Sequence, residues 1–251
     1  MRSKLIELCR SVYSAAFWIF VFLSSMVIYV FSSCVTFFMK SEEKKKIFFQ
    51  KKAAFWGKIV LGVLFIKVKI SGLENIPAGT NVIYTPNHQS YLDIFILLKY
   101  LPSPFKFVVM RKLFKVPFIG YHITKAGFIS LDRKDRKRSI KTIHRVIDLL
   151  EAGRSFVIFP EGKLTLTGKI NDFGRGAGMI VQRAGKPVVP IAIDGTFLVL
   201  PKGAWKLNLP AEVKVTIGKP VYFNRHSSDV TRESSADVAR ELRDMVVKLK
   251  G

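Results

Sequence analysis

The stretch that decides the fold is Asn81–Phe95, NVIYTPNHQSYLDIF. Its first residues are apolar and strand-prone, whereas Pro86 and Asn87 are turn residues, and a second apolar run follows them. The pattern predicts a strand over Asn81–Thr85, a turn, and then a helix that Asn87 or Ser90 caps at its N-terminus. A strand–turn–helix unit that recurs along the chain is typical of an α/β domain.

The unit does recur. Further strands are predicted at Phe65–Ile70, Phe105–Met110, Phe128–Leu131, Ser155–Phe159, Val188–Ile193 and Glu212–Ile217, with helical runs at Lys137–Leu150, Ala177–Ala184 and Ser235–Lys250. Strands that alternate with helices indicate an α/β fold, with a mixed sheet of about seven strands and helices on both faces. Ligands of such sheets usually bind on the loops that follow the carboxyl ends of the strands.

The N-terminal part is unusually apolar, because Ser11–Met39 contains no charged residue. A helix needs roughly 20 residues to span a bilayer, so this run can span it. The heavier basic flank lies after the run, which places the following domain in the cytoplasm. A helix that dips into one leaflet, breaking at Ser24–Ser25 or Ser32–Ser33, fits equally well, and a buried core helix is a third reading.

The next segment, Ile47–Leu64, mixes apolar residues at helical spacing with lysines. The pattern predicts an interfacial helix whose apolar face lies in lipid and whose lysines lie near phosphates. A helix packed on the following domain, with solvated lysines, is the alternative. The sequence thus divides into a membrane-associating helical region, residues 1–66, and an α/β domain, residues 67–251.

Composition limits the partners. The net charge is +23, from 41 Lys+Arg against 18 Asp+Glu, so an anionic partner is expected. The high hydrophobic content favours an anionic membrane surface as the partner. The sequence shows no nucleic-acid-binding motif and no pattern of aromatic and basic residues that would stack on bases, so nucleic acid is not expected to be the partner. Cys9 and Cys34 lack metal-ligand spacing, so neither a disulfide framework nor a metal site is expected.

His88 lies in the turn that follows the predicted strand Asn81–Thr85, and Asp93 lies near the start of the helix after it. Within one regular helix, side chains five residues apart point about 140° away from each other. If His88 lies just outside the helix, its imidazole can fold back onto Asp93, which would leave the other ring nitrogen to take a proton from a hydroxyl. A capped turn with a satisfied loop histidine is the plain alternative. The chain has no GxSxG elbow, so transfer directly to a substrate alcohol is the reaction class expected.

Three later segments add candidate residues at predicted strand ends. GFISLDR ends at Arg133, which could hold a phosphate or lie in a solvated turn. FPEGK supplies Glu161, Gly162 and Lys163, but the first glycine of a phosphate loop is absent. FGRGAG places Arg175 at a helix entry that could bind an anion, without the context of a dinucleotide fingerprint, so no cofactor is expected.

In this order, NHQSYLD, GFISLDR, FPEG and VVPIAI resemble the four sequence blocks of the glycerolipid acyltransferases. The apolar, basic N-terminus is similar to that of bacterial 1-acylglycerol-3-phosphate acyltransferases. The resemblance implies that His88 is the general base for the free sn-2 hydroxyl of lysophosphatidic acid and that Asp93 orients it. The donor would be an acyl thioester of acyl carrier protein or coenzyme A, the product phosphatidic acid, and neither a metal nor a bound cofactor would be needed.

By the same resemblance, Arg133, Glu161 and Gly162 line the acceptor pocket, with Arg133 on the phosphate and Glu161 on hydroxyls. Many members continue the third block with Thr–Arg–Ser, where this chain has Lys163–Leu164–Thr165. Lys163 or Arg175 would then have to supply the missing charge as a point charge. A different acceptor, such as glycerol-3-phosphate or another lysophospholipid, and a non-catalytic membrane scaffold stay open as alternatives. The enzyme is expected at the inner membrane, with its catalytic domain on the cytoplasmic side.

Overall fold

The computed structural model describes residues 2–102, 104–209, 211–223 and 232–251. Its strands are β1 Lys67–Ser71, β2 Ile83–Pro86, β3 Phe105–Met110, β4 Ile129–Leu131, β5 Ser155–Val157, β6 Val188–Asp194 and β7 Glu212–Ile217. Its α-helices are α1 Arg2–Phe37, α2 Glu42–Leu64, α3 Leu92–Tyr100, α4 Ile119–Lys125, α5 Arg136–Glu151, α6 Arg175–Ala184, α7 Thr196–Val199 and α8 Arg232–Lys250. Short 3₁₀ helices occupy η1 Leu73–Asn75 and η2 Arg111–Lys115.

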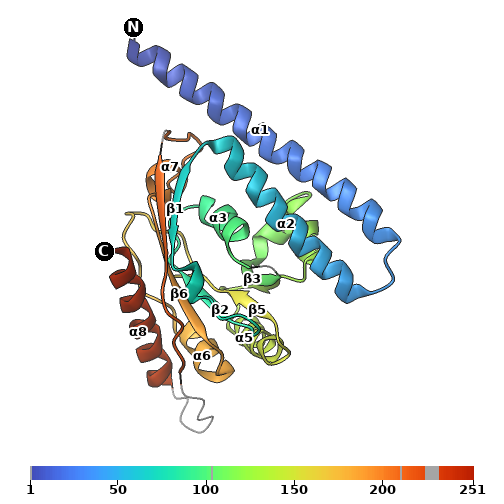
Figure 1. The fold of residues 1–251 in the computed structure, drawn as a ribbon, viewed down its shortest axis with the longest axis vertical. Coiled ribbons are helices and arrows are strands. Elements are labelled where there is room, and N and C mark those ends of the chain that lie inside the picture. Colours follow the sequence, from blue (N-terminus) through green and yellow to red (C-terminus); the bar gives the residue numbers. More distant parts are fainter. Residues whose placement is uncertain (1, 103, 210, 224–231) are drawn as a thin grey trace.

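The strands form one seven-stranded sheet in the order β1-β7-β6-β2-β5-β3-β4. All neighbouring strands are parallel except β6 and β7, so the sheet is mixed as predicted. One apolar core lies under α1, α2 and α3, and a second lies under α5, α6 and α8 on the opposite face (Figure 1). The predicted α/β fold with helices on both faces is therefore confirmed.

Two predicted strands begin two residues later than expected, for local reasons. Phe65 caps α2 in the left-handed conformation, with φ of 51°, so β1 cannot start before that turn ends. Asn81 donates its side-chain amide to Leu150 O at 2.8 Å, which holds it beside α5 and outside the β2 ladder. The short helices α4 and α7 were not predicted, because neither is long enough to show a helical period.

The apolar face of α2 does not face lipid. Its buried positions are Phe49, Gln50, Ala53, Gly57, Val60, Leu61 and Leu64. At Gly57 the backbone approaches α3 so closely that a Cβ atom would lie 2.8 Å from Leu98 Cβ. For these buried positions the predicted contact with lipid is therefore wrong, because α1, α3 and α4 pack against α2.

Helix α1 is continuous, so the breaks that the dipping alternative placed at the serine pairs do not occur. The hydroxyls of Ser24, Ser25 and Ser33 donate to backbone carbonyls three or four residues earlier, which satisfies them inside the helix. A narrow stripe of α1, including Phe17 and Val21, is buried against the rest of the molecule. The opposite face is apolar and exposed, so α1 is not a buried core helix, and Lys4–Phe37 is long and apolar enough to cross a membrane.

Candidate active site

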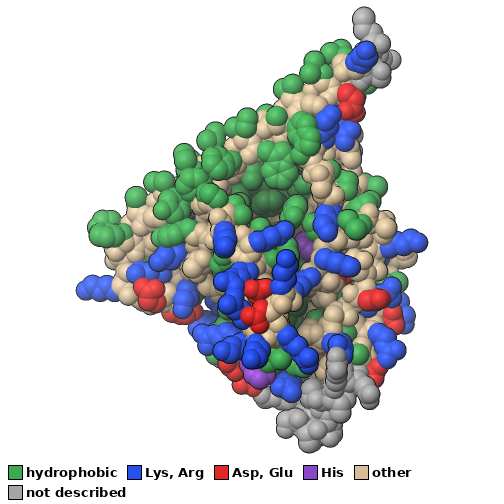
Figure 2. All heavy atoms as spheres, turned by 180° about the vertical axis from the view of Figure 1, so that it is seen from behind, with side chains coloured by type: hydrophobic (Ala, Val, Ile, Leu, Met, Phe, Trp, Pro, Cys, Tyr) green, Lys and Arg blue, Asp and Glu red, His purple; other side chains and the backbone are tan. Residues whose placement is uncertain are grey.

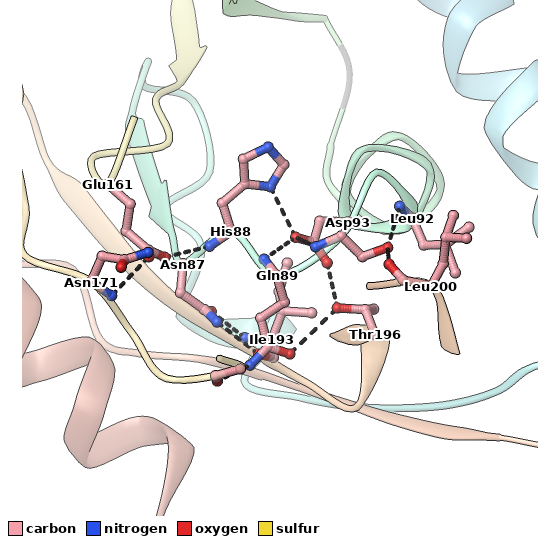
Figure 3. A network of polar contacts seen from close by, with 12 residues as sticks. Asn87, His88, Gln89, Leu92, Asp93, Glu161, Asn171, Ile193, Thr196 and Leu200 are labelled. Carbon is pink, nitrogen blue, oxygen red and sulfur yellow. Dashed lines mark hydrogen bonds and ion pairs between the residues drawn. The ribbon is translucent and has the colours of Figure 1, made fainter. Parts of the chain in front are cut away.

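The loop after β2 carries His88, and Asn87 fixes this loop to the neighbouring strand (Figure 3). The Asn87 side chain accepts the Ile193 N–H at 2.7 Å and donates to Ile193 O at 2.9 Å. The fully buried amide therefore continues the pairing of β2 with β6 beyond the last strand residue. Sequence reasoning assigned Asn87 to a turn or a cap and could not reveal this contact.

The loop after β5 holds the backbone of His88 from the other side. The His88 N–H donates to Glu161 Oε1 at 2.6 Å, and the His88 carbonyl accepts the Thr165 N–H at 3.0 Å. Because β2 and β5 are parallel neighbours, the loops after their carboxyl ends meet at the same sheet edge. The backbone N–H and the carbonyl of His88 are thus both hydrogen-bonded, which fixes the residue that carries the imidazole.

The imidazole of His88 lies outside α3 and folds back onto its first turn. His88 Nδ1 is 2.9 Å from Asp93 Oδ2, and the same oxygen accepts the backbone N–H groups of Gln89 at 2.7 Å and Ser90 at 2.9 Å. The other oxygen, Oδ1, accepts the hydroxyl of Thr196 at 2.6 Å. Asp93 is completely buried, and this set of donors offsets the cost of burying its charge.

The ring plane of His88 is set by stacking. Phe159 lies 3.8 Å from it between ring centroids, with 22° between the planes, and Phe107 lies nearly parallel behind Phe159. In Figure 3 the ring projects away from the polar network, and no described residue hydrogen-bonds to its Nε2 atom. With Nδ1 on Asp93, Nε2 is the nitrogen that can accept a proton from a bound hydroxyl.

Glu161 serves the protein's own backbone. Besides the bond to His88, its Oε2 atom accepts the Asn171 backbone N–H at 2.8 Å and the Asn171 side-chain amide at 2.6 Å. Burial raises the pKa of the Glu161 carboxyl, and the hydrogen bonds from Asn171 and His88 oppose that shift. These contacts show that the carboxylate holds two loops together, and its contact with acceptor hydroxyls stays a prediction.

Arg133 and Gly162, which are far apart in the chain, are brought together. A Cβ atom on Gly162 would lie 2.3 Å from Arg133 Nη2, and Gly162 has a φ of 69°, so a side chain here would displace the guanidinium. Partial burial lowers the pKa of Arg133, and no described residue forms an ion pair with it. Its charge is therefore available to an anionic ligand.

The remaining predicted site residues surround the same loops. Lys163 follows Gly162 directly and is exposed. Arg175 is also exposed and opens α6, which is anchored beside the third block because the Gly174 N–H donates to Pro160 O at 2.8 Å. Leu164 is buried, so the position at which the family resemblance implies an arginine is part of the protein interior here.

Three contributors were missed in the sequence. They are Thr196, which donates to Asp93, Asn171, which donates to Glu161, and Phe159, which stacks on His88. Thr196 had a usable signal, because it follows the predicted strand at Val188–Ile193 and such strand ends carry ligand loops. No group of three or more His, Cys, Asp or Glu side chains in the described ranges is arranged to hold a metal ion.

Comparison with known proteins gives a consistent result. The family model described as Acyltransferase matches residues 67–194. The chloroplastic 1-acyl-sn-glycerol-3-phosphate acyltransferase of Brassica napus is 36% identical over 162 residues, which are 64% of this chain and 47% of that protein. The enzyme of the same name from Pseudomonas aeruginosa is 34% identical over 159 residues, 62% of this chain and 60% of its own. The chain thus spans about half the length of the first curated relatives it matches.

A solved structure matches almost the whole chain. The crystal structure of the 1-acyl-sn-glycerophosphate (LPA) acyltransferase PlsC from Thermotoga maritima superposes with a TM-score of 0.77 at 28% sequence identity. The match covers 96% of this chain and 98% of that one, and so includes the N-terminal helices as well as the sheet.

Proposed function

The chain belongs to the acyltransferase family, and from this premise we propose that it acylates the free sn-2 hydroxyl of lysophosphatidic acid to give phosphatidic acid. The observation that carries the proposal is the His88–Asp93 pair, with Nδ1 engaged and Nε2 open to a substrate. The relatives named as 1-acyl-sn-glycerol-3-phosphate acyltransferases and the matching PlsC structure support this choice of acceptor.

The chemistry follows from the geometry. His88 Nε2 removes the proton from the acceptor hydroxyl as its oxygen attacks the thioester carbonyl carbon, and Asp93 stabilises the imidazolium that forms. When the tetrahedral intermediate collapses, the carbon–sulfur bond breaks and the imidazolium returns its proton to the leaving thiolate. The base is thereby regenerated, and the protein forms no covalent intermediate in this scheme.

Positive charge around the pair supports the proposed acceptor and donor. In this proposal Arg133 binds the acceptor phosphate, while Lys163 and Arg175 are exposed cations on the adjoining loops. The donor in this proposal is the thioester of acyl carrier protein or coenzyme A, both of which are anionic and suit a chain of net charge +23. The proposed reaction uses neither a metal ion nor a bound cofactor.

The surface supports action at a membrane. Figure 2 shows hydrophobic side chains gathered along α1, with lysine and arginine side chains gathered beside them. The α1 residues Arg10 and Trp18 contact the segment after α7, and Tyr29 packs against Phe118 and Tyr121. A helix held against the domain over this length can offer only its outer face to lipid. We therefore place α1 in one leaflet of the inner membrane, with the catalytic domain on the cytoplasmic side.

A donor–acceptor activity matrix on the purified protein tests the proposal. Acyl carrier protein and coenzyme A thioesters are each combined with lysophosphatidic acid, glycerol-3-phosphate and a lysophospholipid with a larger head group. We expect phosphatidic acid from lysophosphatidic acid, and none from the His88→Ala variant. Preference for another acceptor would replace the proposed substrate but keep the mechanism. No turnover with any pair, and no effect of His88→Ala, would leave the scaffold reading.

A further inference from the structure

The segment of residues 201–208, here called the Trp205 loop, follows α7 and lies against the N-terminal half of α1 (Figure 1). Four contacts fix it there. Trp18 Nε1 donates to Trp205 O at 2.8 Å, and Arg10 Nε donates to Leu207 O at 3.0 Å. The Leu207 N–H donates to Ser14 Oγ at 2.9 Å, and Lys206 Nζ pairs with Glu7 at 3.2 Å. The loop is therefore attached to α1 by three hydrogen bonds and an ion pair.

The side chain at the tip of this loop does not join the core. Trp205 is 49% exposed although its backbone is fixed, and Leu198 on α7 is 70% exposed. Lys206 Nζ lies 5.6 Å from the Trp205 ring centroid, and Lys202 is exposed at the start of the loop. An exposed indole with a lysine such as Lys202 close by in the chain is a side-chain set that membrane interfaces favour, because the ring sits at head-group level and the cation can reach lipid phosphates.

The half of α1 that binds the loop also carries exposed apolar side chains on its outer face. Leu8, Val12 and Ile19 lie on the same half of α1 that binds the loop, and each is about 60% exposed. Exposed apolar patches of this kind mark interaction sites. The lysines beside the patch favour an anionic lipid surface over a neutral protein partner.

We propose that the Trp205 loop is a second membrane contact, in which Trp205 inserts at the head-group level of an anionic leaflet beside α1. The inference rests on the membrane attachment proposed above and extends it from a helix to a helix and a loop. Two contacts set side by side restrict rotation of the domain about the α1 axis. The same chain segment leads back through α7 to Thr196 and Asp93, so the orientation set at the membrane is passed to the site.

Site-directed labelling with a polarity-sensitive fluorophore tests the loop. The chain has two cysteines, Cys9 and Cys34, both exposed on α1, so single-cysteine proteins are readily made. One protein keeps Cys34 and reports on α1. A second carries Ala204→Cys beside Trp205, and a third carries Glu241→Cys on the exposed face of α8 as a control, both without the native cysteines.

Each full-length protein is mixed with vesicles that contain phosphatidylglycerol and a lipid-borne quencher. We expect a blue shift and quenching of the label at Ala204→Cys comparable to those at Cys34, and no change at Glu241→Cys. A label at Ala204→Cys that behaves like the α8 control, while Cys34 is quenched, would overturn the loop contact and leave α1 attachment intact. No quenching at either position would refute both, and the activity matrix would show separately whether the enzyme reading survives.

Discussion

Removal of the Thr196 hydroxyl should slow turnover without weakening substrate binding. In Thr196→Val the side-chain shape is kept, but Asp93 Oδ1 loses the donor that lies 2.6 Å away. A hydrogen bond to a charged group contributes about 1.5–3 kcal/mol. Asp93 retains its bonds from Gln89, Ser90 and the imidazole, so we expect the lower end of that range. A loss of about 1.4 kcal/mol corresponds to roughly a tenfold decrease in kcat.

Two variants separate the hydroxyl from the rest of the side chain. Thr196→Ser retains the donor and should restore most of the activity. Thr85→Val is the matched control, because Thr85 is also completely buried and lies on β2, yet no described residue hydrogen-bonds to its hydroxyl. Loss of the Thr85 hydroxyl should leave kcat unchanged.

The assay is steady-state formation of phosphatidic acid, with circular dichroism and thermal unfolding to confirm that each variant folds. Because Thr196 is completely buried, the KM for lysophosphatidic acid should stay at the wild-type value. A wild-type kcat in Thr196→Val would show that the hydroxyl does not position Asp93. An equal loss in Thr196→Ser would show that the defect comes from packing.

Three further variants test other parts of the molecule. His88→Ala should abolish turnover while circular dichroism and vesicle sedimentation stay unchanged, and a loss of fold would make His88 structural. Arg133→Ala should mainly raise the KM for a phosphorylated acceptor in the same kinetic assay, and an unchanged KM would remove it from the phosphate site. Lys106→Met should raise the free energy of unfolding below pH 8 by up to about 3 kcal/mol, because burial lowers the pKa of Lys106 from 10.5 to about 8. Between these two pKa values the unfolded state binds more protons, so the wild type should gain stability as the pH rises from about 8 to 10.5, and the stability advantage of Lys106→Met should vanish above that range. Denaturant unfolding at a series of pH values measures this, with Lys219→Met as an exposed control. A stability advantage that does not change with pH would contradict the prediction.

The sheet was predictable because strand and helix patterns alternate through most of the chain. The sequence did not reveal whether protein or lipid covers the apolar face of each helix. Ile47–Leu64 shows an apolar face, but the pattern cannot tell lipid from protein, and in the structure α1, α3 and α4 pack against this helix. The outer face of α1 is apolar for the opposite reason, since nothing in the described chain packs on it.

The geometry of the His88–Asp93 pair was predictable only in part. Its spacing and its place after a strand suggested that His88 lies outside the helix. The groups that hold it there come from far along the chain: Glu161 is 73 residues from His88, and Thr196 is 103 residues from Asp93. Such contacts depend on strand order, because only adjacent parallel strands bring their following loops together.

Strand order also explains how the four sequence blocks divide their tasks. The first, third and fourth blocks follow or contain β2, β5 and β6, and these three strands are neighbours with β2 in the middle. Their loops can therefore hold the histidine through short backbone contacts from both sides. The second block contains β4 at the edge of the sheet, separated from β5 by β3, so its last residue must reach the site through a long side chain. Arg133 spans that gap, and Gly162 leaves the space in which its guanidinium ends. If the proposed function holds, changes around Arg133 and the third-block residues Lys163 and Leu164 can alter the acceptor while His88 stays in place.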